Sequence, residues 1–581
     1  MSCRSRHFFA INKLALRTSF SSRDIEFPRL STSTRRYLSN VVVESPFPSL
    51  TFPDTTISEF IWKDVHRWGN RTAIICAETG KSYTYNRLRK LCRRFSISLR
   101  KNNFQKGQVV SVILPNMPEY PIVLLGSAEA GLIVTTFNPN FTAEEISRQL
   151  ENSQTKAVIT LASLSSKVTE ARKLIEARTN KPYELTLITI KDEPQSTCEI
   201  NFDEMINETY DNVSVPEVEV CKDDVAILPY SSGTTGFSKG VQLTHSNLVN
   251  NLHQVSADGV NYLEEASDTY QEVIPAVIPF FHIFGIMSIM LQSFLHGGKI
   301  ITLRKFDPAK YLDVLHDDKP TILYLVPTLA FFLTSHPSVG AQHLNTVKIS
   351  FFAGGNTPVG EMEKLVRTGG NKMKVRHAYG LTETSPCVCM SLDNDPYCSV
   401  GKPIANTAIK IVSPNGSILS SYQRGEICVK GPQVMKGYLN NAKATEEAID
   451  QDQFFHTGDI GYYDDDGRFF YVDRMKELIK VKGFQVPPAE LESILKSHNG
   501  VNDVGVIGVP DKRCGEKPIA FVVPKKLREF SESDLKTFVA TKVAPYKQLA
   551  DVVFVESIPR NPSGKILRRI LKENYGNLTR V

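Results

Sequence analysis

The sequence predicts an α/β protein with a large N-terminal domain of α/β subdomains plus a small barrel, followed by a small α+β C-terminal domain. Its 581 residues exceed what one hydrophobic core normally supports, so at least two domains are expected. Apolar, β-branched runs alternate with helical stretches through much of the chain. We therefore predict domains at residues 45–472 and 473–581, preceded by a distinct segment at 1–40.

The α/β pattern is clearest in the first half of the chain. Helical stretches cover residues 143–151 and 168–178. The strand-like runs are 109–114, 157–160, 185–189 and, further on, 322–326. Such alternation is typical of sheets whose strands are connected by crossover helices.

The later part of the chain has a different pattern. Strand-like residues 408–412 and 425–429 are separated by the turn signal Pro414-Asn-Gly416, which favours antiparallel pairing and is interpreted as the small barrel. The last domain has predicted strands at 504–507 and 519–523 and predicted helices at 488–497 and from 533 onward. This mixture predicts the α+β class.

The N-terminal segment carries the whole formal net charge. Residues 1–40 hold eight basic and two acidic residues, which accounts for the net charge of +6. Basic and apolar residues alternate there without an acid before Asp24, as in mitochondrial transit peptides, and Arg35-Arg-Tyr-Leu-Ser39 suits a processing site near residue 37. A disordered basic tail is the alternative, so a cytoplasmic or peroxisomal location stays open.

The remainder of the chain has the composition of an ordinary globular protein. It is neutral by formal charge, so there is no basic excess to predict a nucleic-acid partner. Ten scattered cysteines without Cys-x-x-Cys indicate neither a zinc site nor a disulfide framework. Residues 274–295 carry no formal charge, but Pro279, His282 and Gly285 interrupt them. We interpret this stretch as a buried strand and a core helix, and expect no transmembrane segment.

One loop has the residues needed to hold phosphate. Residues 230–241 contain five Ser or Thr hydroxyls, three glycines and Lys239. Glycines allow the backbone N–H groups to approach an anion closely, and hydroxyls donate further hydrogen bonds. The spacing is wrong for a Walker loop, because Ser238 precedes Lys239 and Gly240 follows it. The flanks 225–229 and 241–245 read as buried strands, so the loop is expected to be a hairpin-like connection.

Further segments accompany the loop in a fixed order. These are Ala378-Tyr-Gly-Leu-Thr-Glu-Thr384, His456-Thr-Gly-Asp459, residues 473–484 and Pro559-Arg-Asn-Pro-Ser-Gly-Lys-Ile566. Together with the loop they resemble the acyl-adenylate-forming enzymes. The similarity covers about residues 50–575 and is nearest to the branch of acyl-CoA synthetases, 4-coumarate–CoA ligases and firefly luciferase.

The resemblance implies roles for the nucleotide-binding residues. The triphosphate would be held by Ser231, Ser232, Gly233, Thr234, Thr235 and Lys239. Tyr379 would stack on adenine, and Asp459 with Arg474 would hold the ribose. Thr382 would touch the α-phosphate and Glu383 would bind Mg²⁺. Lys565 would neutralise charge between the carboxylate and the α-phosphate during adenylation.

The resemblance also implies a second arrangement of a mobile small domain. Lys476 falls at the hinge about which that domain would turn after adenylation. Lys480, Lys482 and Gly483 would then face the thiol and pantetheine tunnel, with Lys305 near the nucleotide of coenzyme A. One site would thus serve two reactions.

The acyl pocket is where the chain departs most from the family pattern. By position it would be lined by His282, Phe284, Ser288, Gly380 and Met390. His377-Ala378 replaces the common Gln-Gly before Tyr379, and Phe284 stands where plant coumarate ligases carry tyrosine. Loss of that hydroxyl favours a less polar substrate.

These observations predict an ATP-dependent carboxylic acid–CoA ligase that forms acyl-AMP and then acyl-CoA. ATP, Mg²⁺ and coenzyme A are the expected cofactors and co-substrates, with a medium-chain fatty acid or an aryl-alkanoic acid as substrate. One alternative is an adenylating enzyme that passes the acyl group to a carrier protein or, as luciferases do, to oxygen. Another is a non-enzymatic acyl-binding or membrane transport protein, motivated by the apolar stretch 274–295.

Overall fold

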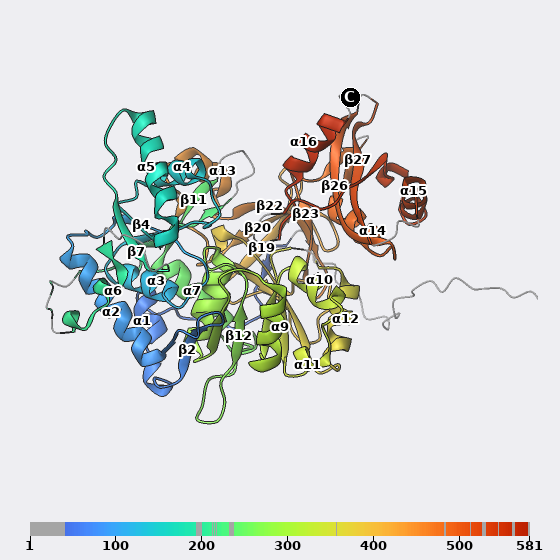
Figure 1. Ribbon diagram of the computed structural model, residues 1–581. Helices are drawn as coiled ribbons and strands as arrows, with labels where there is room; N and C mark the ends of the chain where they lie inside the picture. Colours follow the sequence, from blue (N-terminus) through green and yellow to red (C-terminus); the bar gives the residue numbers. More distant parts are fainter. Residues whose placement is uncertain are drawn as a thin grey trace, which may run out of the picture. The chain divides into compact units, whose positions relative to one another are not determined.

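The computed structural model describes residues 41–192, 200–211, 213, 215, 218–231, 238–355, 357–481, 484–511, 513–525, 530–543, 545–560 and 564–578. Its described strands form five sheets, with helices between them (Figure 1). This mixed architecture confirms the predicted α/β class. No helix among the described residues has both the length and the apolar character that a bilayer span requires.

The largest sheet has nine strands and contains most of the α/β pattern predicted from the sequence. Its order is β10 (Tyr230–Ser231), β11 (Lys239–Thr244), β9 (Val225–Ile227), β5 (Ile133–Thr136), β4 (Val109–Ile113), β6 (Ala157–Leu161), β7 (Thr186–Ile190) and β8 (Ile200–Asn201), with β21 (Gly437–Tyr438) paired to β11. The strands from β9 to β8 run parallel, whereas β11 is antiparallel to both β9 and β10. The predicted hairpin around the loop is therefore present.

Helices connect and cover this sheet. They include α2 (Tyr85–Lys101), α3 (Tyr120–Glu129), α4 (Ala143–Ser153) and α5 (Ser165–Thr179). Thr142 and Glu145 form a reciprocal capping box that fixes the start of α4. Ile146, Leu150 and Val168 from α4 and α5 pack with Val158 of β6 in one apolar cluster.

Two further sheets complete the α/β part. The first contains β12 (Val273–Ala276), β13 (Lys299–Thr302), β2 (Thr72–Cys76) and β3 (Ser82–Thr84). The second contains β14 (Ile322–Leu325), β15 (Ile349–Phe352), β16 (Lys374–Gly380), β17 (Cys387–Met390) and β18 (Lys402–Pro403). Their helices include α1 (Ile57–Trp62), α7 (His245–Val255), α9 (Pro308–Asp317), α10 (Pro327–Ser335) and α12 (Val359–Thr368). The apolar stretch 274–295 forms β12, a π-helix over Gly285–Leu291 and α8 (Gln292–Leu295), and is largely buried.

The strands predicted to form a small barrel make a five-stranded antiparallel sheet. Its path starts at β1 (Val43–Glu44), passes β19 (Ala408–Val412), β20 (Gly425–Lys430) and β22 (Phe455–Tyr463), and ends at β23 (Phe469–Arg474). α13 (Ala442–Ala448) precedes β22.

The C-terminal residues have a core of their own. Their sheet contains β25 (Phe484–Val486), β24 (Ile479–Val481), β27 (Gly515–Pro524), β26 (Val501–Asp511) and β28 (Asp551–Phe554). The accompanying helices are α14 (Pro488–Lys496), α15 (Glu532–Ala540) and α16 (Arg568–Leu578) (Figure 1). Two apolar clusters built from residue 479 onward are separate from the main core, whose last buried member is Phe469. The chain therefore passes from one core to the next between β23 and β24.

Candidate active site

One cavity of about 1070 Å³ is lined by both the main domain and the C-terminal residues. β16 and the turn after it contribute one wall, β22 and β23 contribute another, and α14 and residues 564–568 contribute a third. The cavity contains most of the described residues to which the resemblance assigns a role. Its size is in the range of sites for small molecules and cofactors.

The ribose-binding residues predicted from the sequence are in contact. Asp459 and Arg474 are opposite each other on β22 and β23, with Arg474 Nε 2.8 Å from Asp459 Oδ1. The Tyr379 hydroxyl donates to Asp459 Oδ2 at 2.8 Å. The register of β16 shifts between Tyr379 and Gly380, and a β-bulge of this kind often redirects side chains beside active sites.

Burial controls the electrostatics of this group. Asp459 is almost fully buried, which raises its pKa to about 6, although the Arg474 guanidinium acts in the opposite direction. Burial also raises the pKa of Tyr379, so its phenol stays protonated and remains a donor. The residue before Asp459 in β22 is held by Glu426, whose Oε1 accepts the Gly458 N–H at 2.9 Å.

Glu383 lies next to this group in the turn after β16. Its carboxylate is buried, and its Oε1 accepts hydrogen bonds from the hydroxyls of Ser231 at 2.7 Å and Tyr438 at 3.1 Å. Lys239 Nζ lies 4.7 Å from the centroid of the Tyr438 ring. A carboxylate that accepts from two hydroxyls and has a lysine nearby suits Mg²⁺ and phosphate, since Mg²⁺ prefers hard oxygen ligands and retains several waters.

Some of the residues predicted to bind phosphate or to face coenzyme A lie outside the described residues. This applies to Ser232, Gly233, Thr234 and Thr235 of the loop, and to Lys482 and Gly483 of the small domain. Ser231 and Lys239 border the loop and both line the cavity.

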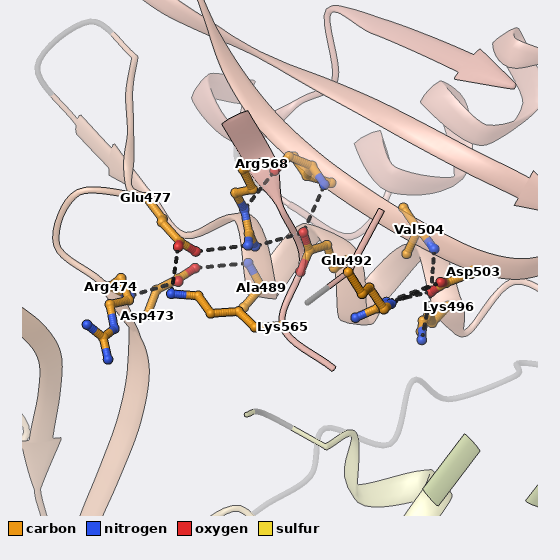
Figure 2. Close-up of polar contacts among 12 residues, drawn as sticks. Asp473, Arg474, Glu477, Ala489, Glu492, Lys496, Asp503, Val504, Lys565 and Arg568 are labelled. Carbon is orange, nitrogen blue, oxygen red and sulfur yellow. Dashed lines mark hydrogen bonds and ion pairs between the residues drawn. The ribbon is translucent and has the colours of Figure 1, made fainter. Parts of the chain in front are cut away.

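Lys565 reaches the cavity from the small domain. Its Nζ lies 3.1 Å from Glu477 Oε1, and Arg568 contacts the other oxygen of the same carboxylate at 2.8 Å (Figure 2). Burial acts to raise the pKa of Glu477, but Arg568 and Lys565 outweigh it, so the pKa is lowered and the carboxylate is ionised. Lys476 also lines the cavity, and its pKa is lowered by desolvation and by the charge of Lys239.

The predicted acyl-pocket residues all line the same cavity. Phe284 and Ser288 are one turn apart at the start of the helix and share its face. The Phe284 ring packs edge-on against Tyr324, with 6.0 Å between centroids, and lies tilted against Phe351 at 6.3 Å. Burial lowers the pKa of His282 to about 4, so its imidazole is neutral. Met390 adds an apolar side chain from β17.

Gly380 is required by its surroundings. A Cβ at this position would lie 1.9 Å from the carbonyl oxygen of Pro386, the residue directly before β17, which folds back beside β16. Only glycine allows this close approach of two backbones. His377, which departs from the family pattern, is a buried residue of the cavity wall, and burial lowers its pKa to about 4.

Two predicted residues are not brought to the cavity. Lys480 is exposed on β24 and its backbone N–H donates to Glu516. Lys305 is exposed between β13 and α9. Neither lines the cavity. Both were expected to act only in the second arrangement of the small domain, which this structure does not represent.

Sequence reasoning missed several polar residues of the site. Tyr438 and Glu426 contact groups that were predicted to face the nucleotide. Glu477 contacts both Lys565 and Arg568, and Arg568 also contacts Glu492 (Figure 2). Glu477 lies in the segment 473–484, but the resemblance assigns it no role. No spacing rule identifies the others, because each is an isolated polar residue in a stretch that reads as strand, turn or solvated helix.

The fold and cavity thus define an α/β enzyme whose site has a polar, charged half and an apolar half. A family model described as AMP-binding enzyme matches residues 61–439, and a model described as AMP-binding enzyme C-terminal domain matches residues 490–565. The chain belongs to the AMP-binding enzyme family.

Named relatives agree with this assignment. 4-Coumarate–CoA ligase 1 of Petroselinum crispum is 36% identical over 545 residues, covering 92% of this chain and 96% of the relative. 4-Coumarate–CoA ligase 3 of Arabidopsis thaliana is 37% identical over 541 residues, covering 91% and 93%. The solved o-succinylbenzoate CoA synthetase from Bacillus subtilis, in complex with its acyl-adenylate intermediate, has a TM-score of 0.71 and 26% identity, covering 90% of this chain and 99% of that one. The predicted membership of the adenylate-forming CoA ligase group is confirmed.

Proposed function

We propose that this enzyme activates an apolar carboxylic acid with ATP in a Mg²⁺-dependent step and then transfers the acyl group to coenzyme A. One observation carries the proposal. Lys565, the Asp459–Arg474 pair and buried Glu383 line the same cavity as the apolar wall that contains Phe284 and Met390. A nucleotide and an acid held in these two halves would have their reacting groups side by side.

In the first step, the substrate carboxylate oxygen attacks the α-phosphorus of ATP and pyrophosphate leaves. The acid is already ionised at neutral pH, so no proton has to be removed. Asp459 accepts hydrogen bonds from the ribose hydroxyls, and Tyr379 packs against the base. Lys565 and Thr382 both line the cavity and would contact the α-phosphate, where negative charge accumulates; such an arrangement lowers the barrier to this step.

Mg²⁺ would be held by Glu383 together with phosphate oxygens of ATP. When bound, the ion neutralises the charge that builds up on the departing pyrophosphate. Ser231 and Tyr438 both donate to Oε1 and so fix the orientation of the Glu383 carboxylate. Lys239 supplies a further positive charge from β11.

In the second step, the thiolate of coenzyme A attacks the acyl carbon and AMP leaves. Lys480 and Lys305 are the residues proposed to face coenzyme A, with Lys482 and Gly483 beside Lys480. Since Lys480 does not line the cavity here, this role requires the small domain to turn about the connection near Lys476.

The apolar half of the cavity supports a medium-chain fatty acid or an aryl-alkanoic acid as the substrate class. Its walls are aromatic and aliphatic, including Phe284, Met287, Phe351 and Met390. His282 is held neutral by burial and therefore does not offer a charge to a second carboxylate. A dicarboxylic acid would leave one carboxylate buried without a partner, which is costly.

We also propose that residues 1–40 direct the protein to mitochondria, on the strength of their eight basic residues and two acidic ones. A fusion of these residues to a fluorescent protein should enter mitochondria. The same fusion with its basic residues changed to Gln should not. Cytosolic or peroxisomal fluorescence of the first fusion would overturn this proposal.

The proposed activity is tested with protein lacking the first 37 residues or so. AMP release is measured with ATP, Mg²⁺ and coenzyme A across fatty acids of graded length and several aryl-alkanoic acids. AMP release that requires coenzyme A and is fastest with one of these acids supports the proposal. Pyrophosphate release without thioester formation would instead indicate another acyl acceptor, and no release with either class of acid would refute the proposed substrates.

A further inference from the structure

A single backbone segment connects the two cores, and Asp473 lies just before it. β23 ends at Arg474, and the small-domain strand β24 begins at Ile479. Between them, Met475 and Lys476 are exposed. Any side chain that reaches from β23 to the small domain therefore restrains how that domain lies over the cavity.

Asp473 makes such a contact across the connection. Its Oδ2 accepts the backbone N–H of Ala489, the second residue of α14, at 3.0 Å, and its Oδ1 accepts the Arg474 N–H at 2.8 Å (Figure 2). The first N–H groups of a helix have no partner within the helix. The N-cap residue of α14 is Pro487, which makes no side-chain capping bond. A residue of β23 thus caps a helix of the small domain.

The Asp473 carboxylate is also tied electrostatically to the group that holds Lys565. It is 3% exposed, and burial raises its pKa while the nearby Arg568 guanidinium opposes that rise. Arg568 contacts Glu477 and Glu492, each at 2.8 Å, and Glu477 in turn contacts Lys565 at 3.1 Å. Figure 2 shows these residues as one continuous cluster beside the start of α14.

We propose that Asp473 is a positioning residue, which holds the small domain through the start of α14 in the arrangement that places Lys565 at the cavity. This inference rests on the proposed function. Asp473 does not act on the reacting atoms. Loss of its contact should therefore slow formation of acyl-AMP, for which Lys565 must lie at the cavity, and should spare transfer of the acyl group from acyl-AMP to coenzyme A.

The test compares D473A and D473N with D534A. Asp534 closes the capping box of α15, where its Oδ2 accepts the Ser531 N–H at 2.7 Å, so D534A also removes a helix-capping carboxylate but leaves the β23 contact intact. Acyl-AMP formation is measured as ATP–pyrophosphate exchange. The substrate is whichever of octanoate, 3-phenylpropanoate and 4-coumarate the unchanged protein converts fastest. Thioester formation is followed separately from supplied acyl-AMP and coenzyme A. Thermal midpoints are recorded for every variant.

For D473A we expect exchange to fall roughly tenfold or more, because a hydrogen bond to a buried charged acceptor is lost. Thioester formation should change less than about twofold, since it does not require Lys565 at the cavity. D473N keeps an oxygen acceptor for Ala489 and should recover part of the exchange rate. D534A should affect neither half-reaction. Equal losses of both half-reactions in D473A, or an unchanged exchange rate, would overturn the proposal.

A second measurement requires no substrate and separates this inference from the proposed function. Trypsin can cleave after Lys476, and a small domain held less firmly should expose this bond more often. We expect D473A to be cut there several times faster than the unchanged protein, with D534A unaffected. An unchanged cleavage rate would count against the restraint, even if none of the three acids supports exchange.

Discussion

Asp459 and Arg474 face each other across β22 and β23, with Arg474 Nε 2.8 Å from Asp459 Oδ1. Because the two residues are opposite each other in register, the sheet itself sets their separation. Tyr379 from a different sheet donates to the other carboxylate oxygen at 2.8 Å. A carboxylate fixed in this way still has lone pairs that could accept the ribose hydroxyls proposed to bind there.

This geometry predicts that nucleoside binding weakens in acid. The pKa of Asp459 is about 6, since burial raises it more than Arg474 lowers it, with smaller contributions from the Tyr379 hydrogen bond, Lys565 and Glu383. Above pH 6 the carboxylate is ionised and accepts strongly, whereas below pH 6 it gains a proton and affinity should fall up to about tenfold per pH unit. Calorimetric titration with adenosine, which carries no phosphate to titrate, checks this between pH 5 and 8.

Two variants test the assignment of that pH dependence to Asp459. In D459N the break in the pH dependence of adenosine affinity near pH 6 should disappear, while the affinity stays low at every pH. R474A removes the charge that opposes burial, so the break should move to higher pH. A break that persists in D459N would assign the titration to another group.

The K565A variant should separate the two half-reactions. Loss of one group that stabilises the transition state lowers a rate by about 10² to 10³, and Lys565 reaches the cavity where the α-phosphate is proposed to lie. ATP–pyrophosphate exchange should fall by that factor, whereas thioester formation from supplied acyl-AMP should be nearly unchanged. K572A, a change on the exposed surface of α16, is the control. An equal fall in both half-reactions would contradict the role of a movable small domain.

Local patterns made much of the fold predictable from the sequence. The predicted strands at 157–160 and 408–412 appear as β6 and β19, because apolar β-branched residues in short runs favour buried strands. The order of the sheets could not be predicted in this way. β21 joins β11 although almost two hundred residues separate them, and nothing near Tyr438 indicates that pairing.

The site was predictable to the extent that its residues fall in recognisable motifs. Tyr379, Asp459 and Arg474 each belong to such a motif, and the structure brings them into contact. Glu477 also falls in the segment 473–484, but nothing in the sequence assigns a role to it or to Arg568, because a charged residue on a helix or turn is normally solvated. Glu477 and Arg568 matter because they form a partly buried ion pair, although about ninety residues separate them in the sequence. This contact exists only in the folded structure.

Glu383 should determine the Mg²⁺ requirement. E383Q keeps an oxygen that can accept from Ser231 and Tyr438, so the thermal midpoint should change little, but it removes the negative charge that attracts the ion. We expect the Mg²⁺ concentration for half-maximal exchange to rise about tenfold. Y438F, which removes one donor and leaves the carboxylate, is the control. An unchanged Mg²⁺ requirement in E383Q would remove Glu383 from the metal site.

Phe284 should control which aryl acids the enzyme accepts. Its ring is buried in the cavity wall against Tyr324 and Phe351. F284Y would add a hydroxyl among apolar side chains, and a buried hydroxyl without a partner costs about 1–3 kcal/mol. A substrate that carries its own hydroxyl can supply that partner, whereas 3-phenylpropanoate cannot.

The expected outcome for F284Y is therefore a change of preference. Its kcat/KM for 3-phenylpropanoate should fall relative to that for 3-(4-hydroxyphenyl)propanoate by about tenfold, which corresponds to one unpaired hydrogen-bonding group. F306Y adds the same hydroxyl to an exposed ring that does not line the cavity, and it should leave the ratio unchanged. If F284Y lowers both values equally, then Phe284 contributes packing alone, and the aromatic end of the substrate lies elsewhere in the cavity.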